Sequence, residues 1–265
     1  MEILAYVASA LIGISLGLIG GGGSILTMPV LVYLFGVNPL LATSYSLFIV
    51  GSTSLAGTVG NFKRGLVNIK TALLFGSASI STVFLTRKLI IPLIPKTILA
   101  IGTFELTENM LMMVLFAVLM VAAATAMIKG GKEKTSTTTE RPKLKLTKLL
   151  FFGIAIGFAT GFLGAGGGFL LIPTLVILLG MPMKEAVGTS LFIIALNSLI
   201  GFTGDLGHFS IDWFFLSKIT TVAIAGIIVG GMISKKIDGG KLKKGFGWFV
   251  LIMGCYIILK EVVLK

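Results

Sequence analysis

Residues 18–29, "LIGGGGSILTMP", place four consecutive glycines between two apolar runs. Glycine inside a helix costs about 1 kcal/mol relative to alanine, so four in a row would cost a continuous helix roughly 4 kcal/mol. The stretch therefore predicts that a helix breaks at these glycines. What the break is for depends on whether water or lipid surrounds it.

Composition indicates lipid. The chain has 265 residues, of which 55% are hydrophobic and 12% charged, and its mean hydropathy is +1.06. Apolar stretches recur from Ile3 to Leu259, and a bilayer core about 30 Å thick needs roughly 20 apolar residues per crossing. Glu2, with no basic residue before the first apolar run, argues against a cleaved signal peptide. We expect an all-α, multi-pass protein of the cytoplasmic (inner) membrane.

The chain contains one unit twice. A shift of 144 residues, without a gap, aligns "GLIGGGGSILTMPVLVYLFG" from Gly17 with "GFLGAGGGFLLIPTLVILLG" from Gly161. The identical pairs include Gly20/Gly164, Gly22/Gly166, Gly23/Gly167, Pro29/Pro173, Gly36/Gly180, Ser46/Ser190 and Ser54/Ser198. Because glycines, a proline and serines align together, we infer an internal duplication.

The duplication divides the chain into three parts. We expect a first membrane repeat at 1–128, a polar cytoplasmic linker at 129–148 and a second membrane repeat at 149–265. Each repeat is predicted to hold an apolar run that ends at the glycines, one short run and three longer runs. The predicted helices are 3–19, 24–35, 38–60, 66–91 and 106–128, then 149–163, 168–179, 183–204, 211–234 and 245–262.

The short runs, 24–35 and 168–179, are too short to cross. Twelve helical residues rise about 18 Å, little more than half of the hydrocarbon thickness. We therefore predict that each glycine run is the tip of a broken or re-entrant helix hairpin; a full crossing stays open as the alternative. Non-helical backbone at that depth is tolerated where it is buried in protein or lines a watery cavity.

A hairpin and three crossings make an odd number of crossings, so the two repeats are predicted to be inverted. In this topology sixteen of the 22 Lys and Arg residues lie on the side of the linker. By the positive-inside rule that side is cytoplasmic and both termini are outside. Arg87 and Lys88 are counted on the outer side and fit this rule poorly.

Inversion would let the two glycine tips meet near the bilayer midplane. Helices that begin near Ser24 and Gly168 would then both point their N-termini, with free N–H groups and positive dipole ends, at one small cavity that suits an anion. We assign a candidate anion site to Gly21, Gly22, Gly23, Ser24, Gly166, Gly167 and Gly168. The alternative is close helix packing, which we expect for Gly13, Gly17, Gly153, Gly157 and Gly161.

A polar stripe on the next helix of each repeat extends this candidate site. Its members are Ser46 and Thr53 in the first copy, and Thr189, Ser190 and Asn197 in the second. Such hydroxyls often bond back to their own helix, which is the competing interpretation. No Lys or Arg lies in the predicted middle of a crossing, so we expect dipoles and hydroxyls to hold the anion weakly.

At this point the sequence resembles the TauE/SafE family of membrane proteins, associated with export of sulfite and small organosulfonates. The resemblance covers nearly the whole chain: the duplicated "GGGGSILTMPVLVYLFG" and "GAGGGFLLIPTLVILLG", the following "ATSYSLF" and "VGTSLF", and the polar central linker. It implies transport of a tetrahedral sulfur-containing anion such as sulfite, sulfoacetate or thiosulfate. Without this resemblance, the residues predict only that the transported ligand is a small anion.

Other functions remain as alternatives. A passive small-anion channel or a transporter of another anion would share these features. A membrane enzyme is disfavoured because the chain has one histidine and no Gly-x-Ser-x-Gly motif. We expect no cofactor, no metal and no nucleic-acid partner; the partners are the anion and the lipid bilayer, and a homo-oligomer stays open.

Coupling is the last open point. An inside-negative potential favours anion export by about 2.3 kcal/mol per charge at 100 mV, so we expect export without a second ion. The alternative is proton-linked transport at His208, because imidazole exchanges protons near neutral pH. Asn61, Asp205 and His208 are the candidate coupling or gating residues.

Overall fold

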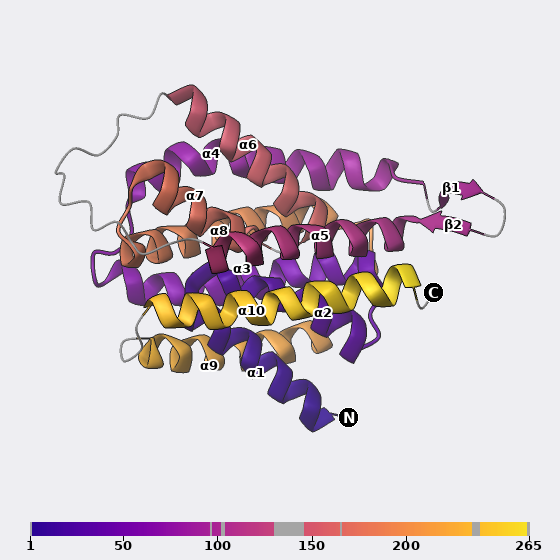
Figure 1. The fold of residues 1–265 in the computed structure, drawn as a ribbon, viewed down its shortest axis with the longest axis horizontal. Coiled ribbons are helices and arrows are strands. Elements are labelled where there is room, and N and C mark those ends of the chain that lie inside the picture. Colours follow the sequence, from indigo (N-terminus) through magenta and orange to yellow (C-terminus); the bar gives the residue numbers. More distant parts are fainter. Residues whose placement is uncertain are drawn as a thin grey trace.

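The computed structural model describes residues 2–95, 97–101, 104–129, 146–164, 166–234 and 239–263. The described part of the chain is a helical bundle with one β-hairpin (Figure 1). The first half holds α1 (Glu2–Ile19), η1 (Gly20–Leu26), α2 (Thr27–Pro29), η2 (Val30–Leu34), α3 (Pro39–Phe62), α4 (Ile69–Leu85), η3 (Thr86–Ile90), η4 (Ile91–Leu93), β1 (Thr97–Ile101), β2 (Phe104–Thr107) and α5 (Glu108–Lys129). The second half holds α6 (Leu146–Leu163), α7 (Gly168–Leu179), α8 (Met183–Asp205), α9 (Trp213–Ile233), α10 (Gly239–Ile258) and η5 (Leu259–Val263).

Most predicted helices are confirmed within a few residues, because long apolar runs between glycines and prolines leave little freedom for their boundaries. The antiparallel pair β1–β2 is a difference. It occupies a stretch that the sequence analysis left between two helices, so the all-helical prediction is wrong there. The predicted linker falls mostly outside the described residues; its first residue ends α5, and its last three begin α6.

The exterior of the bundle fits lipid. Among the described residues, five helical segments are long and apolar enough to cross a membrane: 39–62, 69–93, 108–126, 183–205 and 213–233. Large apolar side chains such as Leu73, Phe151, Phe214 and Ile252 are exposed on the surface. The buried face of α3 and α8, by contrast, carries many serines and threonines. An apolar exterior around an interior that buries hydroxyl groups beside its apolar core fits a helical bundle in a membrane.

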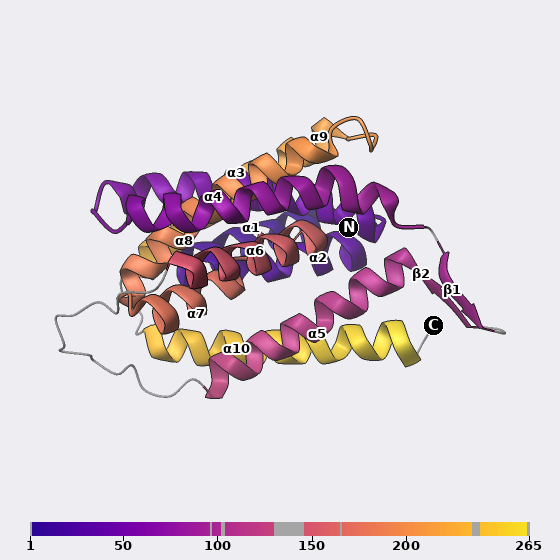
Figure 2. The same ribbon diagram turned by 90° about the horizontal axis from the view of Figure 1, so that it is seen from above.

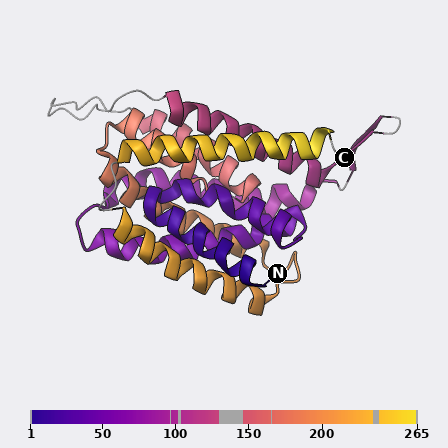
Figure 3. The ribbon, with the colours of Figure 1, turned by 60° about the horizontal axis from the view of Figure 1, so that its bottom comes forward.

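The two halves run in opposite senses through the bundle (Figures 1 and 3). The start of α1, the β-hairpin and the end of α10 lie at one end, which we call the terminal end. α5 ends and α6 begins at the other, the linker end. The first half thus starts at the terminal end and finishes at the linker end, and the second half does the reverse.

Helix pairing follows the duplication. α1 packs on α9, as its copy α6 packs on α4, while α3 packs on its own copy α8. Individual hydrogen bonds also recur in the two halves. The Asn68 side chain accepts from Thr71 N at 3.0 Å and starts α4, whereas the Asp212 side chain accepts from Phe215 N at 3.0 Å and starts α9. These N-caps are 144 residues apart, so one local design begins both helices.

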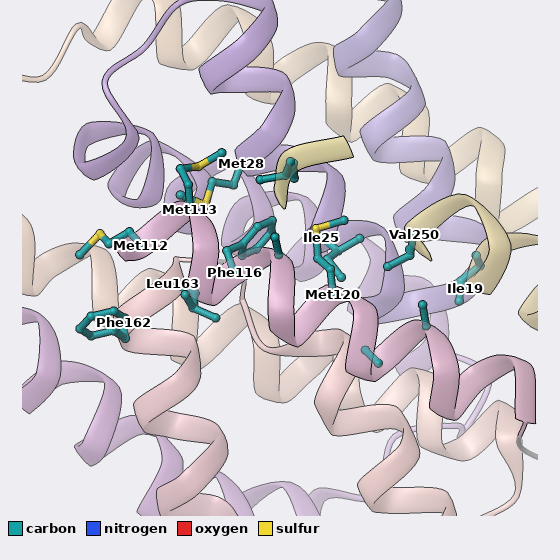
Figure 4. Packing of buried hydrophobic residues seen from close by; sticks show 14 of the residues in the cluster. Ile19, Ile25, Met28, Met112, Met113, Phe116, Met120, Phe162, Leu163 and Val250 are labelled. Atoms are coloured by element: carbon teal, nitrogen blue, oxygen red, sulfur yellow. The ribbon is translucent and has the colours of Figure 1, made fainter. Parts of the chain in front are cut away.

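A methionine-rich layer covers one face of the helical bundle. α5 and α10 lie side by side along that face (Figure 2). Met112, Met113 and Met120 of α5 pack around Phe116, against Met28 of α2 and the end of α6 (Figure 4). Unbranched methionine side chains adapt to shifted neighbours, so this layer suits helices that move against one another.

The packing glycines behave as predicted. A Cβ at Gly13 or Gly17 would overlap the backbone of α9, and one at Gly157 or Gly161 would overlap α4 or η3. In Gly153 the nearest atom would be Phe75 O at 3.1 Å. Glycine at these positions allows the close helix contacts α1–α9 and α6–α4.

Candidate functional site

The two glycine runs touch each other inside the bundle. A Cβ on Gly21 would overlap the Cα of Gly168, and a Cβ on Gly168 would overlap the Cα of Gly21. Each run begins with a left-handed glycine, Gly20 (φ +71°) and Gly164 (φ +66°), which turns the chain where the preceding helix ends. The predicted meeting of the runs is therefore present as direct backbone contact.

The first run differs from the expectation. The helical backbone begins at Gly20, not near Ser24, because Gly20–Leu26 form the 3-10 helix η1, which includes Gly22 and Gly23. Ser24 Oγ donates to Gly21 O at 2.8 Å, so this hydroxyl is already engaged within the turn. The predicted break is present at Gly20, but the backbone that follows it is 3-10 helical, since 3-10 hydrogen bonds tolerate a tighter, glycine-rich turn.

The second run is a true break between α6 and α7. Gly166 and Gly167 both have φ +65°, and Gly167 is the N-cap of α7, which begins at Gly168. A Cβ at Gly167 would overlap Thr160 Oγ1, and one at Gly166 would lie 3.1 Å from Ser198 Oγ. The N-terminus of α7 thus lies close to the hydroxyl groups of Thr160 and Ser198.

The polar stripe divides into engaged and unengaged side chains. Thr53 Oγ1 donates to Ile49 O at 2.5 Å and Ser190 Oγ to Val187 O at 2.9 Å, so both bond back to their own helix. Thr189 Oγ1 accepts from Asn68 N at 2.9 Å near the linker end. Asn197 Nδ2 donates to Ser79 Oγ at 2.6 Å. Thr53 and Ser190 thus follow the competing interpretation, whereas Thr189 and Asn197 are engaged by residues at the start of α4 and within it.

Several buried polar atoms remain without a hydrogen-bond partner in the described part of the chain. They are Ser46 Oγ, Ser54 Oγ, Ser198 Oγ, Thr160 Oγ1 and Asn197 Oδ1, together with Thr27 Oγ1, Ser44 Oγ and Thr86 Oγ1. Ser54, Ser198 and Thr160 were not selected from the sequence, although the identical pair Ser54/Ser198 was a signal. A buried polar atom without a partner costs about 1–3 kcal/mol, so a cluster of them marks a place for a polar ligand.

An ion pair joins the two halves near the terminal end. Arg87 Nη1 donates to Asp205 Oδ2 at 3.1 Å and to Thr43 Oγ1 at 2.9 Å, and both charged side chains are buried. The charge count placed Arg87 on the outer side and Asp205 in a loop. Asp205 is instead the last residue of α8, and Gly204 beside it lets η3 approach, since a Cβ there would lie 3.0 Å from Arg87 Cβ.

A cavity of about 220 Å³ adjoins the ion pair. Arg87, Asp205, Glu108 and His208 contribute to its lining, so groups from both halves and from α5 converge on it. His208 is exposed in the turn after α8, and its backbone N–H donates to the backbone carbonyl of Asp205 at 3.1 Å. Asp205 and His208 thus both line this cavity.

Asn61, the counterpart of Asp205 in the first half, has no such neighbour. Its Nδ2 donates to Gly57 O at 3.0 Å, one turn back in its own helix. The residue 144 positions after Arg87 is Gly231, and a Cβ there would meet nothing within 4 Å. The charged pair therefore occurs at the terminal end and is not repeated at the equivalent place near the linker end.

Comparison with known proteins places the chain. The sequence profile described as Sulfite exporter TauE/SafE matches residues 5–257. The chain belongs to the TauE/SafE family. It is accordingly a membrane transporter, a class distinct from enzymes. No solved structure matches this TauE/SafE transporter significantly.

Relatives of the TauE/SafE transporter match it along nearly their whole length. A probable membrane transporter protein of Xylella fastidiosa (strain 9a5c) is 29% identical over 258 residues, 96% of this chain and 94% of the relative. The probable membrane transporter protein YunE of Bacillus subtilis (strain 168) is 26% identical over 281 residues, 99% of each chain. MJ0441 of Methanocaldococcus jannaschii, a protein of the same description, is 26% identical over 273 residues, 97% of this chain and 95% of the relative.

Proposed function

We propose that this TauE/SafE transporter exports a small sulfur-containing anion, such as sulfite, sulfoacetate or thiosulfate, across the cytoplasmic membrane. The anion binds near mid-depth between two inverted repeats, 1–128 and 149–265, joined by a cytoplasmic linker. Both termini then lie outside. The family description supports the class of anion, and the opposite senses of the two halves support the inversion.

The contact of the glycine runs among unengaged hydroxyls carries this proposal. Gly21 meets Gly168, and beside the neighbouring Gly166 and Gly167 lie the buried hydroxyls of Ser198 and Thr160, which have no partners among the described residues. Hydroxyl O–H groups and the first N–H groups of α7 are donors, and an anion accepts hydrogen bonds from donors alone. In a dry interior such a site binds oxyanions without any fixed charge beside it.

Transport then requires the runs to separate. In the arrangement described, Gly21 and Gly168 are in van der Waals contact, so no ligand fits between them. If the helices on either side of one glycine run rock against those of the other run, the hydroxyl groups become accessible from one side of the membrane at a time. Other transporters with discontinuous helices move in this way. The methionine layer of α5 can follow this motion because its side chains repack easily.

Flux in proteoliposomes tests the function. Radiolabelled sulfite, sulfoacetate, thiosulfate, sulfate and chloride are offered separately, with and without an opposing gradient of the same anion. We expect saturable transport of the sulfur oxyanions driven by membrane potential. Equal, non-saturating flux of all five anions would favour a passive channel, and selective chloride transport would favour another anion.

Two serine variants test the site. Ser198→Ala removes a buried hydroxyl of the cluster, whereas Ser217→Ala removes an exposed hydroxyl that bonds Phe214 O in α9. We expect the first to lower kcat/KM for sulfite about tenfold, the value of one lost hydrogen bond to a charged ligand. The second should leave flux unchanged. If both variants transport sulfite equally well, the anion does not bind at Ser198.

Coupling follows from the same charges. We propose that membrane potential drives export and that His208 is not required, because its side chain is exposed at the edge of the cavity. His208→Ala should keep outward flux and its pH dependence, while collapse of the potential slows export. Loss of the pH dependence in this variant would assign proton coupling to His208.

A further inference from the structure

We propose that the Nε–Nη2 edge of Arg87 is a second binding site for a small oxyanion, located in the terminal-end cavity. This site deepens the proposed function and rests on it for the identity of the anion. Thr43, which accepts from Arg87, contacts Gly164 at the start of the second glycine run, but the chemistry of the two sites differs because a fixed cation holds the ligand at Arg87.

The guanidinium of Arg87 is half used. Asp205 and Thr43 both accept from Nη1, while Nε and Nη2 have no hydrogen-bond partner among the residues that the structure describes, although both are buried. Nε–H and one Nη2–H point in parallel from one edge of the planar group. This edge binds two oxygens of a carboxylate, sulfonate or phosphate at once, so Arg87 presents an unoccupied two-donor fork.

Space for a ligand adjoins Arg87, whose Nε and Nη2 are themselves shielded from solvent in this arrangement. Arg87 lines the 220 Å³ cavity, which exceeds several-fold the roughly 30 Å³ share of one water molecule. The residue lies in η3, six residues before the end of the crossing segment 69–93, which is about 9 Å along a helix. The cavity is therefore near the terminal end, where an anion that has passed the glycine runs would leave in the proposed topology.

The ion pair occurs in one half of the duplication only. Some hydrogen bonds that stabilise the fold recur after 144 residues, as the N-caps Asn68 and Asp212 do, whereas others, such as that from Asn197 to Ser79, have no counterpart. Arg87 and Asp205 correspond instead to Gly231 and Asn61, which leave this position uncharged near the linker end. The fold thus buries two charges, at a cost of several kcal/mol per ion, at the terminal end alone. A site that binds the anion on one side of the membrane only would require this asymmetry.

The neighbouring acids set the strength of binding. The charged and titratable side chains that line the cavity in the described residues are Arg87, Asp205, Glu108 and His208. Asp205 neutralises the guanidinium when no ligand is bound and competes with an arriving anion. Glu108 repels the anion as well, so occupancy is brief and favours singly charged oxyanions.

Binding of ³⁵S-sulfite to the purified protein tests the site, with unlabelled sulfoacetate, acetate and chloride as competitors. The double variant Arg87→Gln/Asp205→Asn removes both charges together, which avoids an unpaired buried ion. We expect it to bind sulfite at least tenfold more weakly than the unaltered chain. The exposed turn residue Arg64 provides the matched control, because Arg64→Gln removes the same charge far from the cavity.

Two further variants keep the test decisive if the double variant does not fold. Arg87→Lys retains the cation but loses the fork, and should weaken sulfite and sulfoacetate about tenfold. Glu108→Gln removes a repelling charge and should tighten both several-fold. Unchanged affinity in these two variants, or in a folded double variant, would overturn the proposal.

The outcomes separate the site from the transport function. Arg87-dependent binding without any flux in proteoliposomes would refute the proposed function and leave the site in place. Flux with no detectable sulfite binding to the unaltered chain, or with binding that Arg87 does not influence, would overturn the site and leave the transport function in place. Displacement by chloride as strong as by sulfoacetate would also count against a two-donor fork.

Discussion

Alanine at the two touching glycines gives the sharpest test of the central contact. A Cβ on Gly21 would lie 2.7 Å from the carbonyl carbon of Gly168, where ordinary van der Waals contact is 3.4–4 Å. The runs would have to separate by about 1 Å, and overpacking of this kind typically costs about 1–3 kcal/mol. In a chain of this size that corresponds to a melting temperature lower by roughly 2–12 °C.

The paired variant adds a signature that single substitutions lack. Gly21→Ala and Gly168→Ala fill the same gap from opposite sides, so one separation accommodates both methyl groups. The double variant should therefore be destabilised by clearly less than the sum of the two single variants. Melting temperatures of the purified chain in detergent measure all three.

Gly231→Ala is the matched control, because a Cβ there meets nothing within 4 Å and the residue lies inside helix α9. Its melting temperature should stay the same or rise, since alanine favours helix more than glycine does. If Gly21→Ala melts no lower than Gly231→Ala, or if the double variant is strictly additive, the two runs are not in contact and the central site has to be placed elsewhere.

Three further predictions concern the ion pair, a cap and the orientation. Asp205→Asn leaves Arg87 buried without its counterion and should lower the free energy of unfolding by about 3–5 kcal/mol in chemical denaturation, against a much smaller loss when both charges are removed together; equal losses would mean that water already solvates the guanidinium. Asn68→Ala deletes the N-cap of α4 and should cost about 1 kcal/mol, seen as a lower melting temperature, and no change would show that the cap is replaced by a neighbour. In a cysteine-free background, Ser210→Cys should react with an impermeant thiol reagent outside intact cells and Lys63→Cys should not, whereas the reverse pattern would invert the proposed topology.

Local signals in the sequence determined the helical framework. The runs around residues 39–62 and 183–205 are predicted well because apolar length and bounding prolines act within one segment. The duplication is equally readable, and with it the position of both helix breaks, since Gly20 and Gly164 need the left-handed backbone that glycine adopts without strain. The strands β1 and β2 were missed because each is only four or five residues long, which leaves little pattern to recognise.

The tertiary structure decided which polar groups are engaged and which are free. Thr53 and Ser190 looked equivalent to Ser46 from spacing alone, yet a side-chain rotation of each hydroxyl toward its own helix removes the first two from the site. Arg87 and Asp205 are 118 positions apart and become partners because the fold packs η3 of one half against α8 of the other. Sequence spacing shows which residues share one face of a helix. The burial of Arg87 beside Asp205 and the backbone contact between Gly21 and Gly168 depend instead on how separate helices pack, which no local pattern encodes.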